Sequence, residues 1–91
     1  MSKKNDYNIK SEIFKALGHP VRLQVLDGLL KSDGCNVNEI VEKFKIPQST
    51  VSQHLKVLRT NNIISFHKEG VKVCYKVINK KVIEIINILK R

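Results

Sequence analysis

The sequence predicts a mainly α-helical domain that carries one small β-hairpin. Apolar residues recur at intervals of three and four through most of residues 9–60, which is typical of amphipathic helices. After Asn61 and Asn62 apolar and polar residues alternate, which is typical of strands, and the helical period returns after Asn79. A chain of 91 residues is enough for one domain. We therefore expect a flexible tail over residues 1–8 and a single folded domain over residues 9–91.

Five helices are expected, and most of their ends carry a local signal. Gly18 ends the first helix, and Pro20 suits the first turn of the second. We expect Asn36 to cap the third helix and to form a capping box with Glu39. The five helices begin near Ile9, at Pro20, near Asn36, near Gln48 and at Lys80, where Asn79 is the cap.

The third and fourth helices, joined by a tight turn at residues 45–47, form a helix-turn-helix. Val51, Leu55 and Leu58 make the buried stripe of the fourth helix, and its outer face carries amides, hydroxyls and cations. These groups suit base edges and phosphates, and Gln53 is the best candidate for reading a base. Alternatively, the outer face of this helix is exposed to solvent and has no role in binding DNA. The candidate DNA contacts in this helix are Gln48, Ser49, Thr50, Ser52, Gln53, Lys56 and Arg59.

The alternating segment after the fourth helix predicts a hairpin with a turn at residues 68–70. The inner face would hold Ile64, Phe66, Val71, Val73, Tyr75 and Val77. The outer face would be basic, and Lys68 and Lys72 are its candidate DNA contacts. A hairpin that directly follows a helix-turn-helix makes a wing. The complete prediction is a winged helix-turn-helix with five helices and a two-stranded wing.

Charge and composition narrow the function further. The formal net charge is +9, which favours polyanions, nucleic acid before an anionic membrane surface. We find no paired carboxylates, catalytic triad or phosphate-binding loop, so we do not expect an enzyme. No apolar run could span a bilayer and the first residues do not resemble a secretory signal, so we expect a cytoplasmic protein without a membrane partner.

The last helix has more apolar surface than one packing face needs. At about 100° per residue, its apolar residues cover an arc of roughly 220°. A small domain buries only a modest share of its surface, so we expect a homodimer through the first and last helices. The alternative is a helix wrapped more deeply by its own domain. The expected interface residues are Ile9, Ile13, Val82, Ile85, Ile86 and Leu89.

Cys35 and Cys74 are too few for a disulfide scaffold. Cys35 occupies a position from which it can pack on Ile40 as a hydrophobic staple. Strand alternation places Cys74 on the exposed face with Lys72 and Lys76, where cations would make the thiol reactive. Cys35 and Cys74 are therefore a candidate redox pair, although the sequence leaves the distance between them open.

Several segments together resemble one family of regulators. The runs ALGHPVRLQVL from Ala16, VNEIVEKF from Val37 and PQSTVSQHLKVLR from Pro47, with a wing that ends in VCYKV, resemble the ArsR family of bacterial winged-helix repressors. The resemblance implies a homodimer that represses transcription on a palindromic operator until an inducer releases it. It also implies structural roles for His19, as the cap of the second helix, and for Arg22.

The metal-sensing positions of that family are not filled here. Where one family site has Cys-x-Cys, this chain has Asn36 and Asn38, and neutral amides are poor ligands for a soft metal. The last helix, where a second family site uses Asp and His, offers only Glu84. We therefore expect a branch that does not sense metals, without a cofactor, and we can identify no small-molecule ligand.

The sequence thus predicts a DNA-binding transcriptional repressor that acts as a homodimer on double-stranded operator DNA. Three alternatives remain open at this point. The first is a winged-helix module that controls another regulator through protein contacts, and the second is a binder of RNA or structured DNA. The third is a repressor that senses thiol oxidation through Cys35 and Cys74.

Overall fold

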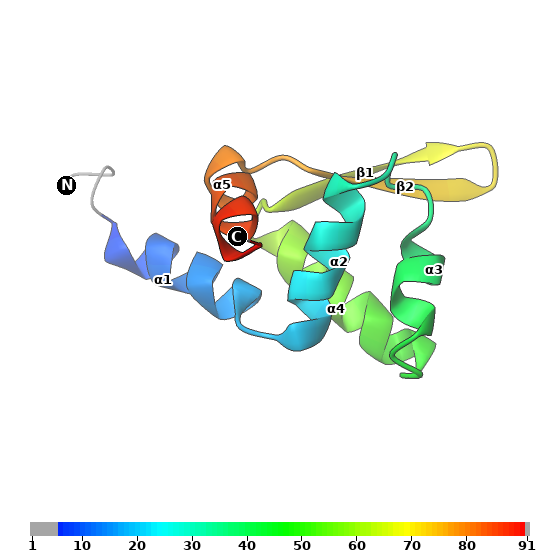
Figure 1. Ribbon diagram of the computed structural model, residues 1–91, viewed down its shortest axis with the longest axis horizontal. Helices are drawn as coiled ribbons and strands as arrows, with labels where there is room; N and C mark the ends of the chain where they lie inside the picture. Colours follow the sequence, from blue (N-terminus) through cyan, green and yellow to red (C-terminus); the bar gives the residue numbers. More distant parts are fainter. Residues whose placement is uncertain (1–5, 91) are drawn as a thin grey trace.

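The computed structural model describes residues 6–90 and shows five helices and one antiparallel hairpin (Figure 1). The predicted fold class, a winged helix-turn-helix, is confirmed. The molecule measures 43 × 30 × 23 Å, and α1 and the tip of the hairpin lie at opposite ends of its long axis. The elements are α1 (Tyr7–Leu17), α2 (Pro20–Leu30), α3 (Val37–Glu42), α4 (Gln48–Thr60), β1 (Ile64–Glu69), β2 (Lys72–Val77) and α5 (Lys80–Leu89).

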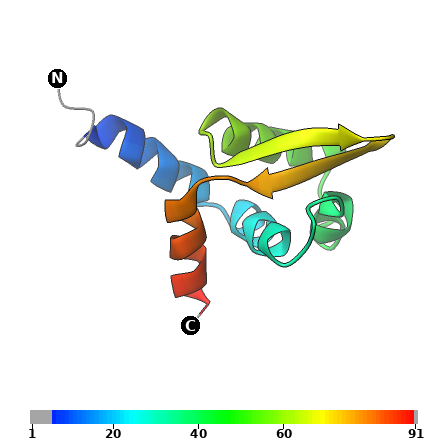
Figure 2. The same ribbon diagram turned by 90° about the horizontal axis from the view of Figure 1, so that it is seen from above.

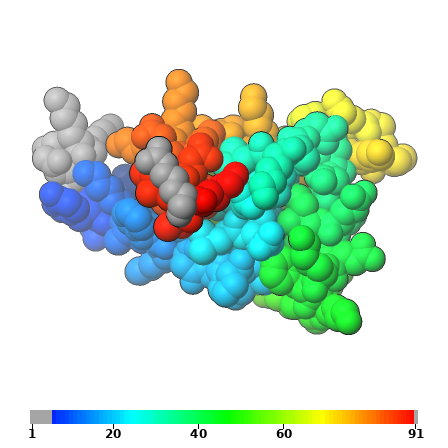
Figure 3. Space-filling model, in the orientation of Figure 1, coloured from blue at the N-terminus to red at the C-terminus, as the bar shows by residue number. Residues whose placement is uncertain are grey.

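Helix α2 is the centre of the core. It contacts the other four helices and β2, and Val25 and Leu26 are completely buried within it. Leu58 of α4 and Val82 of α5 are also completely buried. The space-filling view shows α5 lying against the face of α2 (Figure 3). Within residues 6–90, no helix is long and apolar enough to cross a membrane.

Three helices begin at side-chain caps. The Asp6 carboxylate accepts hydrogen bonds from the N–H groups of Asn8 and Ile9, so α1 begins two residues before the expected position. The flexible tail predicted over residues 1–8 is therefore wrong at residues 7 and 8, and its residues 1–5 lie outside the described part of the chain. His19 caps α2, because its Nδ1 accepts from the N–H of Val21 at 3.1 Å. The expected cap of α5 is also confirmed, since the Asn79 amide oxygen accepts from two N–H groups of the first turn.

The predicted capping box of the third helix is wrong. Helix α3 begins after Asn36, but the Asn36 side chain makes no capping hydrogen bond. Its amide oxygen instead accepts from the Ser32 hydroxyl at 2.8 Å. The same Ser32 oxygen lies 3.1 Å from the carbonyl oxygen of Gly28, so its single proton is shared between the end of α2 and the start of α3.

The segment between α2 and α3 runs beside the wing. The carbonyl of Gly34 accepts a hydrogen bond of 2.9 Å from the N–H of Tyr75 in β2. Gly34 has a φ of +84°, and a Cβ at this position would overlap the Tyr75 carbonyl. Glycine is therefore required here both by the backbone conformation and by the close approach.

This segment corrects the predicted faces of the hairpin. Cys74 is completely buried, not exposed beside Lys72 and Lys76, because the loop before α3 covers that face of β2. Val71, expected on the inner face, is fully exposed because it lies in the turn between β1 and β2. Seen from above, the hairpin projects well beyond the helices (Figure 2).

Candidate DNA-binding site

Helix α4 presents a polar face to solvent, as predicted. Val51, Leu55 and Leu58 are buried, which turns the opposite side of the helix outward. Thr50 is half-buried, and no acidic residue occurs in the helix. Among the predicted contacts in α4, the exposed side chains are Gln48, Ser49, Ser52, Gln53, Lys56 and Arg59.

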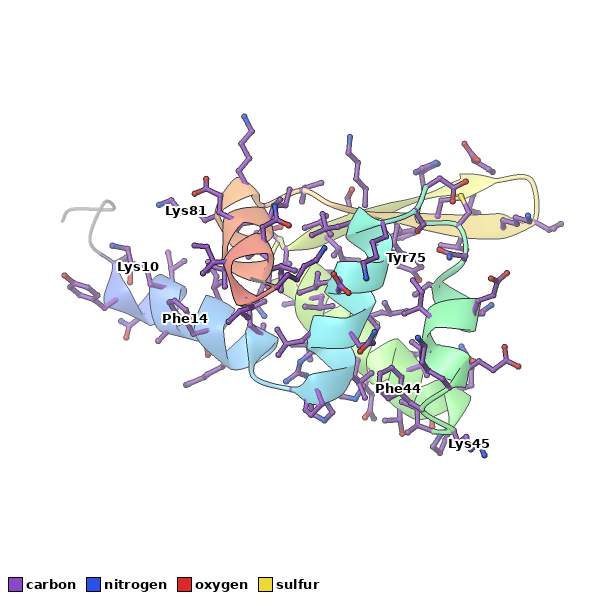
Figure 4. The ribbon with its side chains drawn as sticks, in the orientation of Figure 1. Lys10, Phe14, Phe44, Lys45, Tyr75 and Lys81 are labelled. Atoms are coloured by element: carbon purple, nitrogen blue, oxygen red, sulfur yellow. A yellow bond between two sulfur atoms is a disulfide. The ribbon has the colours of Figure 1, made fainter. Side chains whose placement is uncertain are left out.

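The start of α4 is open to an anion. Pro47 occupies the N-cap position without a side-chain hydrogen bond to the helix. The first N–H groups of a 13-residue helix, together with its dipole, make such an end suitable for a phosphate. Lys45 follows Phe44 in the turn between α3 and α4 and has a φ of 53° (Figure 4).

His54 fixes the inner side of α4 against the start of α2. Its ring lies 4.3 Å from the ring of His19, centroid to centroid, and its Nδ1 is 3.4 Å from Nη1 of Arg22. Burial lowers the pKa of His54, and the nearby His19 and Arg22 lower it further. A second guanidinium nitrogen of Arg22 donates to the carbonyl of Lys15 at 3.5 Å. The structural roles implied for His19 and Arg22 agree with these contacts.

The wing lies beside α4, and its predicted contacts Lys68 and Lys72 are both exposed. A groove of about 330 Å³ separates the first turns of α4 from the wing, and Gln48, Ser52 and Lys72 are among its lining residues. Near the other end of α4, the Arg59 guanidinium lies over the ring of Phe66 in β1 at 5.0 Å. Phe66 was not predicted at this surface, because strand alternation places its ring on the inner face of the hairpin.

Cys35 and Cys74 form a disulfide between the loop before α3 and strand β2. The packing of Cys35 on Ile40 as a staple stays a prediction. The carboxylate of Glu69 in β1 lies 3.9 Å from the sulfur of Cys35 and 3.8 Å from that of Cys74. Glu69 was missed because only the pairing of the strands brings it close to residues distant in the chain.

Helices α1 and α5 carry several exposed apolar side chains and lie at the end of the molecule away from the wing tip (Figure 1). Val82 and Ile86, expected at a dimer interface, are instead buried within the protomer. Their side chains face α2, which the wide apolar arc of the sequence could not distinguish from an intermolecular face. Ile13 and Ile85 are half-buried. The large exposed apolar residues on these helices are Tyr7, Ile9, Phe14, Ile88 and Leu89, of which Tyr7, Phe14 and Ile88 were not predicted.

Comparison with known proteins agrees with this geometry. Residues 19–65 match the family model described as bacterial regulatory protein, arsR family. The transcriptional repressor PagR of Bacillus anthracis is 38% identical over 79 residues, which cover 87% of this chain and 79% of PagR. The crystal structure of PagR matches with a TM-score of 0.78 and 34% identity, over 96% of this chain and 99% of PagR. The crystal structure of NolR from Sinorhizobium fredii matches with a TM-score of 0.80 and 28% identity, over 98% of this chain and 90% of NolR.

The fold, the exposed polar helix and these matches confirm the predicted class, a winged helix-turn-helix DNA-binding regulator. The chain belongs to the arsR family of bacterial regulatory proteins.

Proposed function

We propose that this chain represses transcription as a homodimer bound to a palindromic operator in double-stranded DNA. The main support is the row of uncharged hydrogen-bonding side chains on the outer face of α4, next to a basic wing. A helix that only needed to be soluble has no reason to exclude acidic residues from this face. Repression, rather than activation, is suggested by the names of PagR and other similar relatives.

Some of the exposed side chains contact DNA bases, and others contact the phosphate backbone. Gln53 reads a base, because a glutamine amide can form two hydrogen bonds with adenine in the major groove. Ser49, Thr50 and Ser52 lie near the N-terminal part of the helix, from which recognition helices contact bases. Backbone phosphates are held by the start of α4 at Gln48 and by the cations Lys56, Arg59, Lys68 and Lys72.

The dimer is formed by the exposed apolar surfaces of α1 and α5. Ile9 and Leu89 are 59% and 64% exposed in the protomer, which is unfavourable for a large apolar side chain in water. Phe14 on α1 and Lys81 at the start of α5 mark the two elements (Figure 4). The interface would also include Ile13 and Ile85. A two-fold dimer would place its recognition helices in successive major grooves, about 34–36 Å apart.

A footprint of the purified protein on DNA upstream of its own gene tests this function. We expect protection of a palindrome whose half-sites lie about one helical turn apart. Competition with duplex RNA of the same sequence should not remove the protein from the operator. Absence of binding to any upstream fragment at low salt would instead favour the module that controls another regulator.

The disulfide supports a second candidate function, in which thiol oxidation controls operator binding. The sequence predicted an exposed face that contains Lys72, Cys74 and Lys76, but Cys74 is buried. The support is now the covalent connection between the helix-turn-helix and the wing, which hold different parts of the proposed DNA site. Operator affinity is measured for the oxidised protein, the reduced protein and the Cys35→Ser variant. Equal affinity in all three would reject redox control.

A further inference from the structure

Three side chains with metal-binding groups meet at one edge of the wing. The donor atoms of Cys35, Glu69 and Cys74 all lie within 4.8 Å of one another. They come from the loop before α3, the end of β1 and the middle of β2. Sequence spacing does not connect them, because the two cysteines are 39 residues apart.

The two cysteines are expected to spend much of their time as thiols. A regulator of transcription works where chromosomal DNA lies, and in that compartment low-molecular-weight thiols keep most cysteines reduced. Two such thiols reduce the Cys35–Cys74 bond by exchange. Two protein thiols form, and the two reductant sulfurs are joined in a new disulfide, so that two electrons and two protons reach the protein.

We propose that the reduced Cys35 and Cys74, together with Glu69, bind one thiophilic divalent cation of the zinc type. On binding, each thiol releases its proton to solvent and forms a sulfur–metal bond, and one carboxylate oxygen of Glu69 is the third ligand. Water completes a tetrahedral set. Two thiolates and a carboxylate suit Zn²⁺, which accepts sulfur, nitrogen and oxygen ligands.

The distances in the structure agree with this coordination. From usual zinc–sulfur and zinc–oxygen bond lengths, a sulfur and an oxygen in a tetrahedral site are about 3.6 Å apart. The Glu69 oxygen is already 3.9 Å from the sulfur of Cys35 and 3.8 Å from that of Cys74. Only the sulfurs must move, from a bonded pair to a separation of about 3.8 Å.

The surrounding contacts hold the three ligands in place. The hydrogen bond from Tyr75 to Gly34 holds the loop beside β2 directly next to the two cysteines. The Cys35 N–H donates to the Asp33 carboxylate at 3.0 Å, which fixes the loop locally. His67 pairs with Cys74 across the hairpin, and its Nε2 is 3.4 Å from the other oxygen of Glu69. His67 can therefore orient the carboxylate from outside the metal site.

Metal titration of the reduced, full-length protein tests the proposal without DNA. Zn²⁺ is added in competition with a chromophoric chelator, and Co²⁺ is added separately as a spectroscopic probe. We expect one metal ion per chain and a thiolate-to-cobalt charge-transfer band. The oxidised protein should bind neither ion, because its sulfurs are joined to each other.

Variants assign the ligands. Cys35→Ser and Cys74→Ser should each abolish the charge-transfer band or greatly reduce it, and Glu69→Gln should weaken Zn²⁺ binding. Glu84→Gln on α5 makes the same charge change away from the cluster and should bind as the wild type does. His67→Gln should weaken binding by about tenfold, as expected for an outer partner.

Two results would overturn the site. One is failure of the reduced wild-type protein to bind Zn²⁺ or Co²⁺, and the other is unchanged binding by the half-buried Cys35→Ser variant. Unchanged binding by Glu69→Gln would overturn the three-ligand assignment. Circular dichroism checks the fold of Cys74→Ser, whose side chain is buried, while Cys35→Ser gives an independent test. Because the assay contains no operator, a negative result leaves the proposed repressor function intact.

Discussion

The guanidinium of Arg59 lies over the ring of Phe66, with its Cζ atom 5.0 Å from the ring centroid. This contact joins the last turn of the recognition helix to the first strand of the wing. Arg59 is a proposed phosphate contact, so Phe66 orients a charge that would otherwise be free to move. The two parts of the proposed DNA site are therefore coupled through a side-chain pair.

Replacement of Phe66 by Leu should weaken operator binding. The variant keeps an apolar side chain but removes the aromatic face, and an exposed cation–π contact contributes about 0.5–1 kcal/mol. The expected loss of affinity is roughly two- to fivefold, measured by fluorescence anisotropy with labelled operator. Phe66→Tyr keeps the aromatic face and should bind like the wild type. Equal affinity of the Leu and wild-type proteins would show that the contact does not position Arg59.

Replacement of Gln53 by Ala should reduce sequence preference. The variant should lose on the order of 1–3 kcal/mol at the operator and little at random DNA, because it removes a base contact. Lys72→Ala is the contrasting variant: it should weaken binding to all sequences and reduce the slope of log affinity against log salt. Both are measured over a salt series on operator and random duplexes. A loss for Gln53→Ala of the same size on both duplexes would refute base reading.

A charge placed on the apolar surface of α5 should separate the dimer. Leu89→Glu puts a carboxylate where the proposed interface excludes water, and burial of an unpaired charge is strongly unfavourable. Sedimentation velocity should show a shift from dimer to monomer. Val71→Glu makes the same kind of change at the fully exposed wing turn and should remain dimeric. A Leu89→Glu protein that sediments like the wild type would move the interface elsewhere.

The stability of the fold should fall on mild acidification because of His54. Its pKa in the folded protein is below its ordinary value of 6.5, so the unfolded chain binds the proton more readily. The contribution of neutral His54 is therefore complete above about pH 6.5 and is lost as the pH falls toward the lower folded pKa. Thermal melting between pH 7.5 and pH 5.5 measures this loss. His54→Gln should flatten the dependence, and an unchanged dependence in this variant would contradict the assignment to His54.

Gly34 and Gly70 both have a positive φ. Comparing alanine substitutions at these two positions therefore tests the contact between the loop before α3 and strand β2. Gly70→Ala introduces a Cβ with no atom within 4 Å, so it should cost only the backbone penalty of about 1–2 kcal/mol. Gly34→Ala carries a similar backbone penalty, and its Cβ also overlaps the Tyr75 carbonyl. Urea unfolding should show a clearly greater loss of stability for Gly34→Ala. Equal losses would mean that the loop can leave β2 at little cost.

Short-range sequence patterns were sufficient to predict most of the fold. The bounds of α4 were predicted because apolar residues recur at helical spacing between Pro47 and Asn61. The caps of α2 and α5 are also short-range features, in which His19 and Asn79 bond to N–H groups two or three residues away.

The errors about Cys74 and α5 share a physical cause, which is contact between parts distant in the chain. The capping-box error is local, because Ser32 binds the Asn36 side chain. Strand alternation correctly put Cys74 on the face opposite Tyr75, but it could not show that the loop at Gly34 covers that face. The sequence pattern identified the apolar residues of α5. It could not show which of them pack against α2, as the buried Val82 does, and which remain exposed for a partner. The identity of the residues that contact DNA stays a prediction.

The attachment of the wing at Tyr75 and Cys74 divides the hairpin into a fixed base and a free arm. Only about 10 Å of strand extends from Cys74 to the turn at Val71. Insertion of two residues in each strand beyond that point would lengthen the arm by about 7 Å and keep the same side chains facing outward, whereas one residue would turn them over. The reach of this protein along DNA can therefore change in steps of two residues while the recognition helix stays the same.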